Sequence, residues 1–169
     1  EEELACLVKA SQLADAAFKY IADKICPGMK EKEVAWEIEK FLRGRSSEPV
    51  PFDIIVASGP NAALPHAKPT ERPLSPSEPI IVDLGAMVEG YSSDMSRTFC
   101  LGSGDETFTK VYNLILQAQL TALANLKAGM TGEQVDSLAR RLIKQGGYED
   151  AFGHGLGHGV GLATHEQPR

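Results

Sequence analysis

The feature that most constrains the fold is a helical unit that occurs twice, at an offset of 101 residues. Pro27-Gly28-Met29 in the first half recurs as Ala128-Gly129-Met130 in the second, and the apolar positions 34, 41 and 42 recur at 135, 142 and 143. In each half, a helix, a glycine turn, a second helix and a polar linker precede a segment that reaches a histidine. Self-similarity on this scale favours two related lobes about a pseudo-twofold axis. The alternative is chance agreement between amphipathic helices, which the shared Gly-Met turn disfavours.

Hydrophobic periodicity predicts the elements within this repeat. Apolar residues at helical spacing predict helices over residues 1–25, 30–43, 106–126 and 132–145. Runs of β-branched and apolar residues predict strands over 53–58, 80–88 and 91–101, with a polar linker at 44–51 and a proline-rich loop at 65–79. Glu89-Gly90 predicts a two-residue hairpin turn between the last two strands. Lys30–Glu33 and Arg140-Arg141 are expected to lie on solvated helix faces.

Charge and composition exclude several functional classes. A net charge of −6 argues against a nucleic-acid partner. The longest apolar stretch is interrupted by Asp83, so nothing approaches the roughly 20 apolar residues of a membrane helix, and no secretory signal opens the chain. The three cysteines (Cys6, Cys26 and Cys100) are odd in number and widely spaced, which argues against a disulfide framework or a zinc site. We therefore expect no nucleic acid and no membrane as partners, and a cytoplasmic location.

Two aspartates on the predicted hairpin form the first candidate site. If Glu89-Gly90 is the turn, Asp83 faces Ser96, and Asp94 lies two positions along the same face, within side-chain reach. Two carboxylates held this close repel, so either one is protonated or a cation lies between them. A structural ion pair between Asp83 and Arg97 is the alternative to a metal site.

The second candidate site is a glycine-rich segment that carries three of the four histidines. His154 and His158 alternate with glycines, and His165 follows. Glycine allows close backbone approach to a ligand, and imidazole suits metal binding and proton transfer. Carboxylates combined with imidazoles suit divalent ions such as Mn²⁺, Co²⁺, Zn²⁺ or Fe²⁺. A flexible loop with incidental histidines is the alternative.

Several motifs, in the same order along nearly the whole chain, resemble the catalytic domain of the pita-bread metallopeptidases. The similarity is greatest to the Xaa-Pro branch, aminopeptidase P and prolidase. The motifs that carry it are Phe52 to Thr70, Asp83-Leu84-Gly85, Gly90 to Thr98, His154 to Leu162 and His165 to Pro168. The resemblance implies an α/β (α+β) pita-bread fold, with two pseudo-symmetric lobes and a curved, largely antiparallel sheet.

The resemblance also implies a role for each candidate residue. Asp83, Asp94 and His158 would ligate two divalent metal ions, Mn or Co before Zn or Fe, with Asp94 as the bridging ligand. His154 and His165 would line the substrate pocket and steady the tetrahedral intermediate, with His66 on the opposite wall. The implied activity is hydrolysis of the Xaa-Pro bond at or near the amino terminus of peptides, by a hydroxide that the two metals activate. The implied substrates have proline at the second position, and a homodimer is possible.

The chain also departs from this family's pattern. The family completes its metal site with two glutamates on strands after the His-Glu-Xaa-Pro segment, whereas this sequence ends at Arg169. Glu166 is not in the place of either glutamate and is expected to make a local polar contact. We therefore expect residues 1–169 to be a catalytic domain that is incomplete at its carboxyl end, lacks the creatinase-like amino-terminal domain, and is inactive alone.

Two other functions are compatible with parts of the pattern. Methionine aminopeptidase belongs to the sister branch, but its motif usually differs around the first aspartate, and the run from His158 to Leu162 marks the Xaa-Pro side. A catalytically inactive pita-bread binding module is the alternative from another functional class. Asp83 and Asp94 argue against creatinase, which shares the fold without the metal aspartates.

Overall fold

The computed structural model describes residues 1–45 and 48–168, and the chain divides into two compact units. Unit 1 comprises residues 1–104 and 160–164, and unit 2 comprises residues 105–159 and 165–169. The polar linker predicted at 44–51 therefore lies partly outside the described residues. Each unit has its own hydrophobic core.

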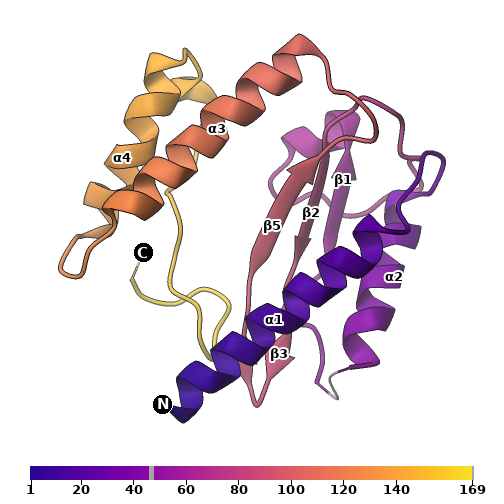
Figure 1. The fold of residues 1–169 in the computed structure, drawn as a ribbon, viewed down its shortest axis with the longest axis horizontal. Coiled ribbons are helices and arrows are strands. Elements are labelled where there is room, and N and C mark those ends of the chain that lie inside the picture. The colour runs from indigo at the N-terminus through magenta and orange to yellow at the C-terminus, as the bar shows by residue number, and fades with distance from the viewer. Residues whose placement is uncertain (46–47, 169) are drawn as a thin grey trace. The chain divides into compact units, whose positions relative to one another are not determined.

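Unit 1 combines two helices with two small antiparallel sheets (Figure 1). The helices are α1 (Glu2–Ala22) and α2 (Glu31–Arg43). The larger sheet has the order β1-β2-β5 and consists of β1 (Ile55–Ser58), β2 (Ile80–Leu84) and β5 (Met95–Phe99). The smaller sheet pairs β3 (Met87–Val88) with β4 (Tyr91–Ser92), and a 3-10 helix, η1 (Gly59–Ala63), follows β1. The predicted helices and the first predicted strand of this half are confirmed, with shorter bounds.

The core of unit 1 lies between the helices and one face of the larger sheet. Along β2, Ile80, Val82 and Leu84 are fully buried, whereas the residues between them are only partly buried. The side chains that complete this core include Ala14, Ala17, Ile21, Val34, Ile38, Phe41 and Val56. Because side chains alternate along a strand, Asp83 belongs to the face of the sheet opposite this core.

The two long strands predicted at 80–88 and 91–101 are each interrupted. The residues between the strand pairs are Gly85-Ala86 on one side and Ser93-Asp94 on the other. A side chain at Gly85 would clash with the Ser93 carbonyl oxygen, only 2.2 Å from an ideal Cβ. The Ser93 hydroxyl accepts a hydrogen bond from the Ala86 amide and donates one to Ala10 O in α1. The prediction of continuous strands was wrong at this point, because a serine side chain takes over part of the backbone pairing.

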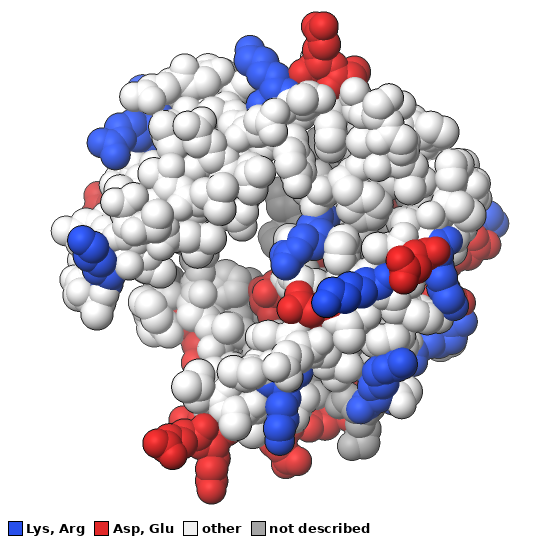
Figure 2. Space-filling view, viewed as in Figure 1, with Lys and Arg blue, Asp and Glu red and all other residues white. Residues whose placement is uncertain are grey.

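Unit 2 contains two helices and a small core. The helices are α3 (Glu106–Asn125) and α4 (Gly132–Gln145), followed by a short 3-10 helix, η2 (Glu149–Ala151). The buried residues of this core are Ala118, Ala122, Ala139 and Ile143. Several large apolar side chains of α3 are exposed: Tyr112, Ile115, Leu116, Leu120 and Leu123. Uncharged surface predominates over this helix in Figure 2.

The repeated Gly-Met turn has the same backbone geometry in both units. Gly28 and Gly129 have φ values of +91° and +90°, a region that favours glycine. The following methionine amides donate to Cys26 O and Lys127 O at 3.3 and 3.2 Å. The predicted helical repeat is therefore confirmed. In the described part of unit 2, the backbone after α4 forms a 3-10 turn and one isolated bridge rather than strands.

A buried glutamate fixes the loop that follows β1. Glu31 is the first residue of α2 and is completely buried. Its carboxylate accepts hydrogen bonds from the amide and hydroxyl of Ser58 (2.7 and 2.8 Å), the amide and hydroxyl of Thr70 (3.0 and 2.7 Å) and the Asn61 side chain. The prediction that residues 30–33 form a solvated face was wrong for Glu31, because five donors replace its hydration.

Charged side chains of both signs share the surface. On the face drawn in Figure 2, lysine and arginine are interspersed with aspartate and glutamate. None of the helices in the described residues combines the length and apolar character needed to cross a bilayer.

We predict that Glu31→Gln lowers the free energy of unfolding by about 1–3 kcal/mol, because it leaves buried donors without an acceptor. Glu39→Gln is the matched control, since Glu39 lies on the same helix in a solvent-accessible ion pair with Arg43. Its effect should stay below about 0.5 kcal/mol. Urea unfolding measures both, and equal effects would contradict a special role for Glu31.

The contribution of Glu31 should also depend on pH. Burial alone would raise the pKa of this carboxyl, but hydrogen bonds from Thr70 and Ser58 lower it below its usual 4.5. A lowered folded-state pKa stabilises the fold above the unfolded value, and this stability disappears as the pH falls through the folded value. The difference in unfolding free energy between the wild type and Glu31→Gln should therefore be constant near neutral pH and shrink below 4.5. A difference that grows on acidification would contradict this assignment.

Candidate functional site

The register of the hairpin in unit 1 is the one that the sequence predicts. Val88 pairs with Tyr91 across the Glu89-Gly90 turn, and Asp83 pairs with Ser96. The Ser96 hydroxyl donates to Asp83 Oδ1 at 2.9 Å, so these side chains share one face of the sheet.

Asp94 belongs to the same face as Asp83. On each strand, two residues separate the pair Leu84–Met95 from the pair Met87–Ser92. Neither strand therefore contains a bulge that would shift the alternation of side chains. The neighbours of Asp94 are directed to the core side: the Ser93 hydroxyl bonds to α1, and Met95 packs against the core. Alternation then assigns Asp94 to the opposite side, with Asp83.

The alternative ion pair between Asp83 and Arg97 is not favoured. Arg97 pairs with Val82, which is fully buried on the core side, and its guanidinium lies 3.9 Å from Asp15 of α1. Asp83 and Arg97 therefore point to opposite faces of the sheet. The hairpin presents a carboxylate face on one side and an arginine on the other.

The loop that carries His66 is held at both ends by the carboxylate of Glu31. Ser58 and Asn61 precede the histidine, and Thr70 follows it. His66 itself is exposed. The structure thus combines an accessible imidazole with a loop whose ends are anchored in the core of unit 1.

In unit 2, His154 and His158 make the same local contact. The Nδ1 atom of each ring lies 3.0 and 2.9 Å, respectively, from the carbonyl oxygen of the following glycine, Gly155 or Gly159. A carbonyl oxygen only accepts, so this contact assigns a proton to Nδ1 and leaves the lone pair of the neutral ring on Nε2. Metal-binding histidines commonly show this arrangement, because the backbone contact fixes the tautomer and the ring orientation.

His158 and His165 lie against each other. Their ring centroids are 4.1 Å apart, with a tilt of 37°. The backbone next to them forms an antiparallel bridge in which Gly159 and Glu166 exchange two hydrogen bonds of 3.0 Å. The backbone of Glu166 thus makes a local polar contact. A methyl group at Gly159 would come within 2.2 Å of Gln167 O, so the bridge requires glycine there.

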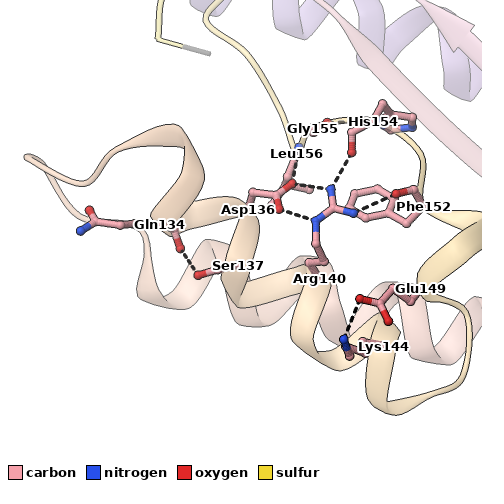
Figure 3. Close-up of polar contacts among 10 residues, drawn as sticks. All are labelled: Gln134, Asp136, Ser137, Arg140, Lys144, Glu149, Phe152, His154, Gly155 and Leu156. Atoms are coloured by element: carbon pink, nitrogen blue, oxygen red, sulfur yellow. Dashed lines mark hydrogen bonds and ion pairs between the residues drawn. The ribbon is translucent and has the colours of Figure 1, made fainter.

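Two side chains of α4 organise the segment before this bridge (Figure 3). Asp136 and Arg140 form an ion pair that also bonds to the backbone of residues 152–156. Asp136 and Arg140, together with His158 and His165, line an open pocket of about 490 Å³ in unit 2. The expectation that Arg140-Arg141 forms a solvated face was wrong for Arg140, which folds back onto this segment.

The structure thus places the predicted residues in two groups. Asp83 and Asp94 share a face of the sheet in unit 1. His66, on its anchored loop, belongs to the same unit. His154, His158 and His165 occur together in unit 2. The expectation that the two carboxylates point toward His158 stays a prediction. Sequence reasoning missed Glu31, Asp136 and Arg140. Only the i, i+4 spacing of Asp136 and Arg140 was available as a signal.

Comparison with known proteins identifies close relatives over the whole chain. A profile described as metallopeptidase family M24 matches residues 5–169. The Xaa-Pro dipeptidase of Pyrococcus furiosus is 40% identical over 169 residues, which are 100% of this chain and 49% of the relative. The solved Xaa-Pro dipeptidase of Bacillus anthracis has a TM-score of 0.96 at 42% identity, over 99% of this chain and 47% of that one.

A third relative carries a different activity name. The X-Pro aminopeptidase of Thermotoga maritima has a TM-score of 0.95 at 40% identity, over 99% of this chain and 47% of that structure. The chain therefore spans about half the length of the relatives it matches. These structures have the pita-bread fold that the sequence predicts.

We predict that Gly159→Ala separates His158 from His165, because the added methyl group forces the bridge open. Nuclear Overhauser effects between the two rings should disappear, and exchange of the Glu166 amide should accelerate. Gly155→Ala is the matched control, since a methyl group there meets no described heavy atom within 4 Å. Ring contacts that survive in Gly159→Ala would contradict the role given to this glycine.

Proposed function

The chain belongs to metallopeptidase family M24, and we propose that it carries the catalytic residues of an enzyme that hydrolyses the Xaa-Pro peptide bond. The observation that carries this proposal is the carboxylate face of the hairpin, where the register aligns Asp83 with Ser96 and brings Asp94 to the same side. The similarity to Xaa-Pro dipeptidases over the full chain supports it.

We propose that Asp83, Asp94 and His158 ligate divalent metal ions, with Asp94 as the bridging ligand between two ions. The donor chemistry fits, since carboxylate oxygens and a neutral imidazole suit Mn²⁺ or Co²⁺ as well as Zn²⁺ or Fe²⁺. The contact of His158 Nδ1 with Gly159 O supports ligation through Nε2. Bound metal would supply a hydroxide nucleophile at neutral pH and polarise the scissile carbonyl.

The other histidines act on the substrate in this proposal. His154 and His165 line the substrate pocket and steady the tetrahedral intermediate, where preorganised polar groups are most effective. The contacts of the His154 ring with Gly155 O and with the Phe152 ring (T-shaped, 5.1 Å between centroids) support a fixed ring orientation. His66 binds the substrate from its anchored loop, and the substrates are peptides with proline at the second position.

The two alternatives are less well supported. The relatives named above carry Xaa-Pro activities, which does not favour methionine aminopeptidase. The relatives are named as enzymes, and this chain retains the candidate metal ligands Asp83, Asp94 and His158. Both observations disfavour an inactive binding module. We keep a cytoplasmic location, which the free cysteines support, and a homodimer as further proposals.

We predict that the complete natural protein, supplied with Mn²⁺ or Co²⁺, hydrolyses an Xaa-Pro dipeptide or an Xaa-Pro-Xaa tripeptide. Comparing these two substrates distinguishes a dipeptidase from an aminopeptidase. A chelator should abolish turnover, and added metal should restore it. Hydrolysis confined to peptides with amino-terminal methionine and no proline would overturn the proposal in favour of the sister branch.

Asp94→Ala and His158→Ala should each lower kcat by at least about 100-fold, since even outer-shell changes at metal sites reach that range. Thermal unfolding of the metal-free variants should remain cooperative. Asp53→Ala, at an exposed aspartate that precedes β1, is the control and should leave turnover unchanged. Full activity in Asp94→Ala would show that the ligand set is wrong.

A further inference from the structure

We propose that Arg140, fixed by Asp136, is a positioning residue that holds the backbone on both sides of His154. The conformational part of this inference stands on the structure of unit 2 alone, whereas its catalytic part rests on the proposed function. Neither residue is among the candidate ligands or substrate-binding histidines. Both come from α4 and act through the segment that follows it (Figure 3).

The ion pair between the two side chains is a two-point contact. Arg140 Nε donates to Asp136 Oδ2 at 2.6 Å, and Arg140 Nη2 donates to Asp136 Oδ1 at 2.9 Å. The side chains are 33% and 18% exposed, so the pair is largely shielded from water. The hydrogen bond from Arg140, followed by that from the Leu156 amide, keeps the pKa of Asp136 below its usual value despite partial burial. The carboxylate therefore stays ionised and keeps the guanidinium in one orientation.

The pair also makes three hydrogen bonds to the backbone of one segment. Arg140 Nη1 donates to Phe152 O, and Nη2 donates to His154 O, both at 2.8 Å. Asp136 Oδ1 accepts from the Leu156 amide at 2.9 Å. The pair thus bonds to residues 152, 154 and 156, and Figure 3 shows these three groups converging on it.

The segment needs such contacts because packing constrains it weakly. Residues 153, 155 and 157 are glycines, which lose the most conformational freedom on ordering. Methyl groups at Gly153 and Gly155 would meet no described heavy atom within 4 Å. Between the packed side chains of Phe152 and Leu156, the backbone conformation thus depends on hydrogen bonds.

Arg140 also reaches the imidazole of His154 through Phe152. The guanidinium carbon lies 4.5 Å from the centroid of the Phe152 ring, and that ring meets the His154 ring in a T-shaped contact with 5.1 Å between centroids. Only a planar guanidinium donates to a carboxylate and two carbonyls while stacking on an aromatic ring. Lysine at this position would keep the charge but lose the fork, so Arg140→Lys isolates the geometry from the charge.

The experiment compares Arg140→Lys and Asp136→Asn with Arg141→Lys, which alters the exposed neighbour of Arg140. Amide exchange and carbonyl ¹³C shifts of residues 152–156 are measured by NMR. In the complete natural protein, kcat and KM are measured on an Xaa-Pro peptide with Mn²⁺. We expect exchange of the Leu156 amide to accelerate about tenfold in both test variants, a change on the scale of one charged hydrogen bond. The carbonyl signals of Phe152 and His154 should shift in Arg140→Lys.

Activity should respond as it does to misplacement of a catalytic group. In the metal-loaded protein, kcat should fall by up to about 100-fold in Arg140→Lys. KM should stay within about twofold if ground-state binding is unchanged. Arg141→Lys should match the wild type in every measurement.

Two results would overturn the inference. If exchange accelerates equally throughout α3 and α4, the pair merely stabilises unit 2, and if residues 152–156 are unaffected, it does not hold the segment. Asp136→Asn keeps the shape of the aspartate. If Arg140→Lys fails to fold, amide exchange in Asp136→Asn distinguishes the same outcomes. If the complete natural protein leaves Xaa-Pro peptides intact, the proposed function fails and the catalytic part falls with it, whereas the exchange data still decide the conformational part.

Discussion

Hydrogen bonding of backbone groups outside helices and strands is the constraint on which the candidate site depends. The histidine-bearing segments are irregular, so their amides and carbonyls lack the partners that regular structure supplies. In each unit a carboxylate from the second helix provides them: Glu31 bonds to the ends of the His66 loop, and Asp136, with Arg140, bonds to residues 152–156. Both carboxylates have a lowered pKa, in each case because their hydrogen bonds outweigh the effect of burial.

This arrangement reconciles two requirements of the proposed metal and peptide site. The imidazoles must be accessible, and His66, His154, His158 and His165 are all exposed. They must also be held in place, because a catalytic group that is displaced by about 1 Å loses much of its effect. Anchors at a buried or shielded helix position meet both needs at His66 and His154, since each ring stays open while the main chain near it is fixed.

The sequence predicted the regular part of the structure well and the polar anchors poorly. The hairpin register followed from Glu89-Gly90 alone, because a two-residue turn determines every pair behind it, down to Asp83 with Ser96. The breaks at Gly85 and Ser93 were missed, since alternation does not reveal that a serine hydroxyl replaces a ladder hydrogen bond. Glu31 was assigned to a solvated face because periodicity distinguishes apolar from polar positions only, and its partners lie 27 to 39 residues away.

The internal repeat shows how far symmetry extends into the site. The helices and Gly-Met turns match at an offset of 101, with nearly equal φ at Gly28 and Gly129. The anchors do not match: the equivalent of Glu31 is Gly132, and the equivalent of Asp136 is Ala35. Helix packing tolerates exchange among apolar residues of similar volume, so one pattern serves both halves. A loop hydrogen bond needs a particular acceptor at a particular point, and because the two loops follow different paths, each unit supplies its carboxylate from a different turn of the helix.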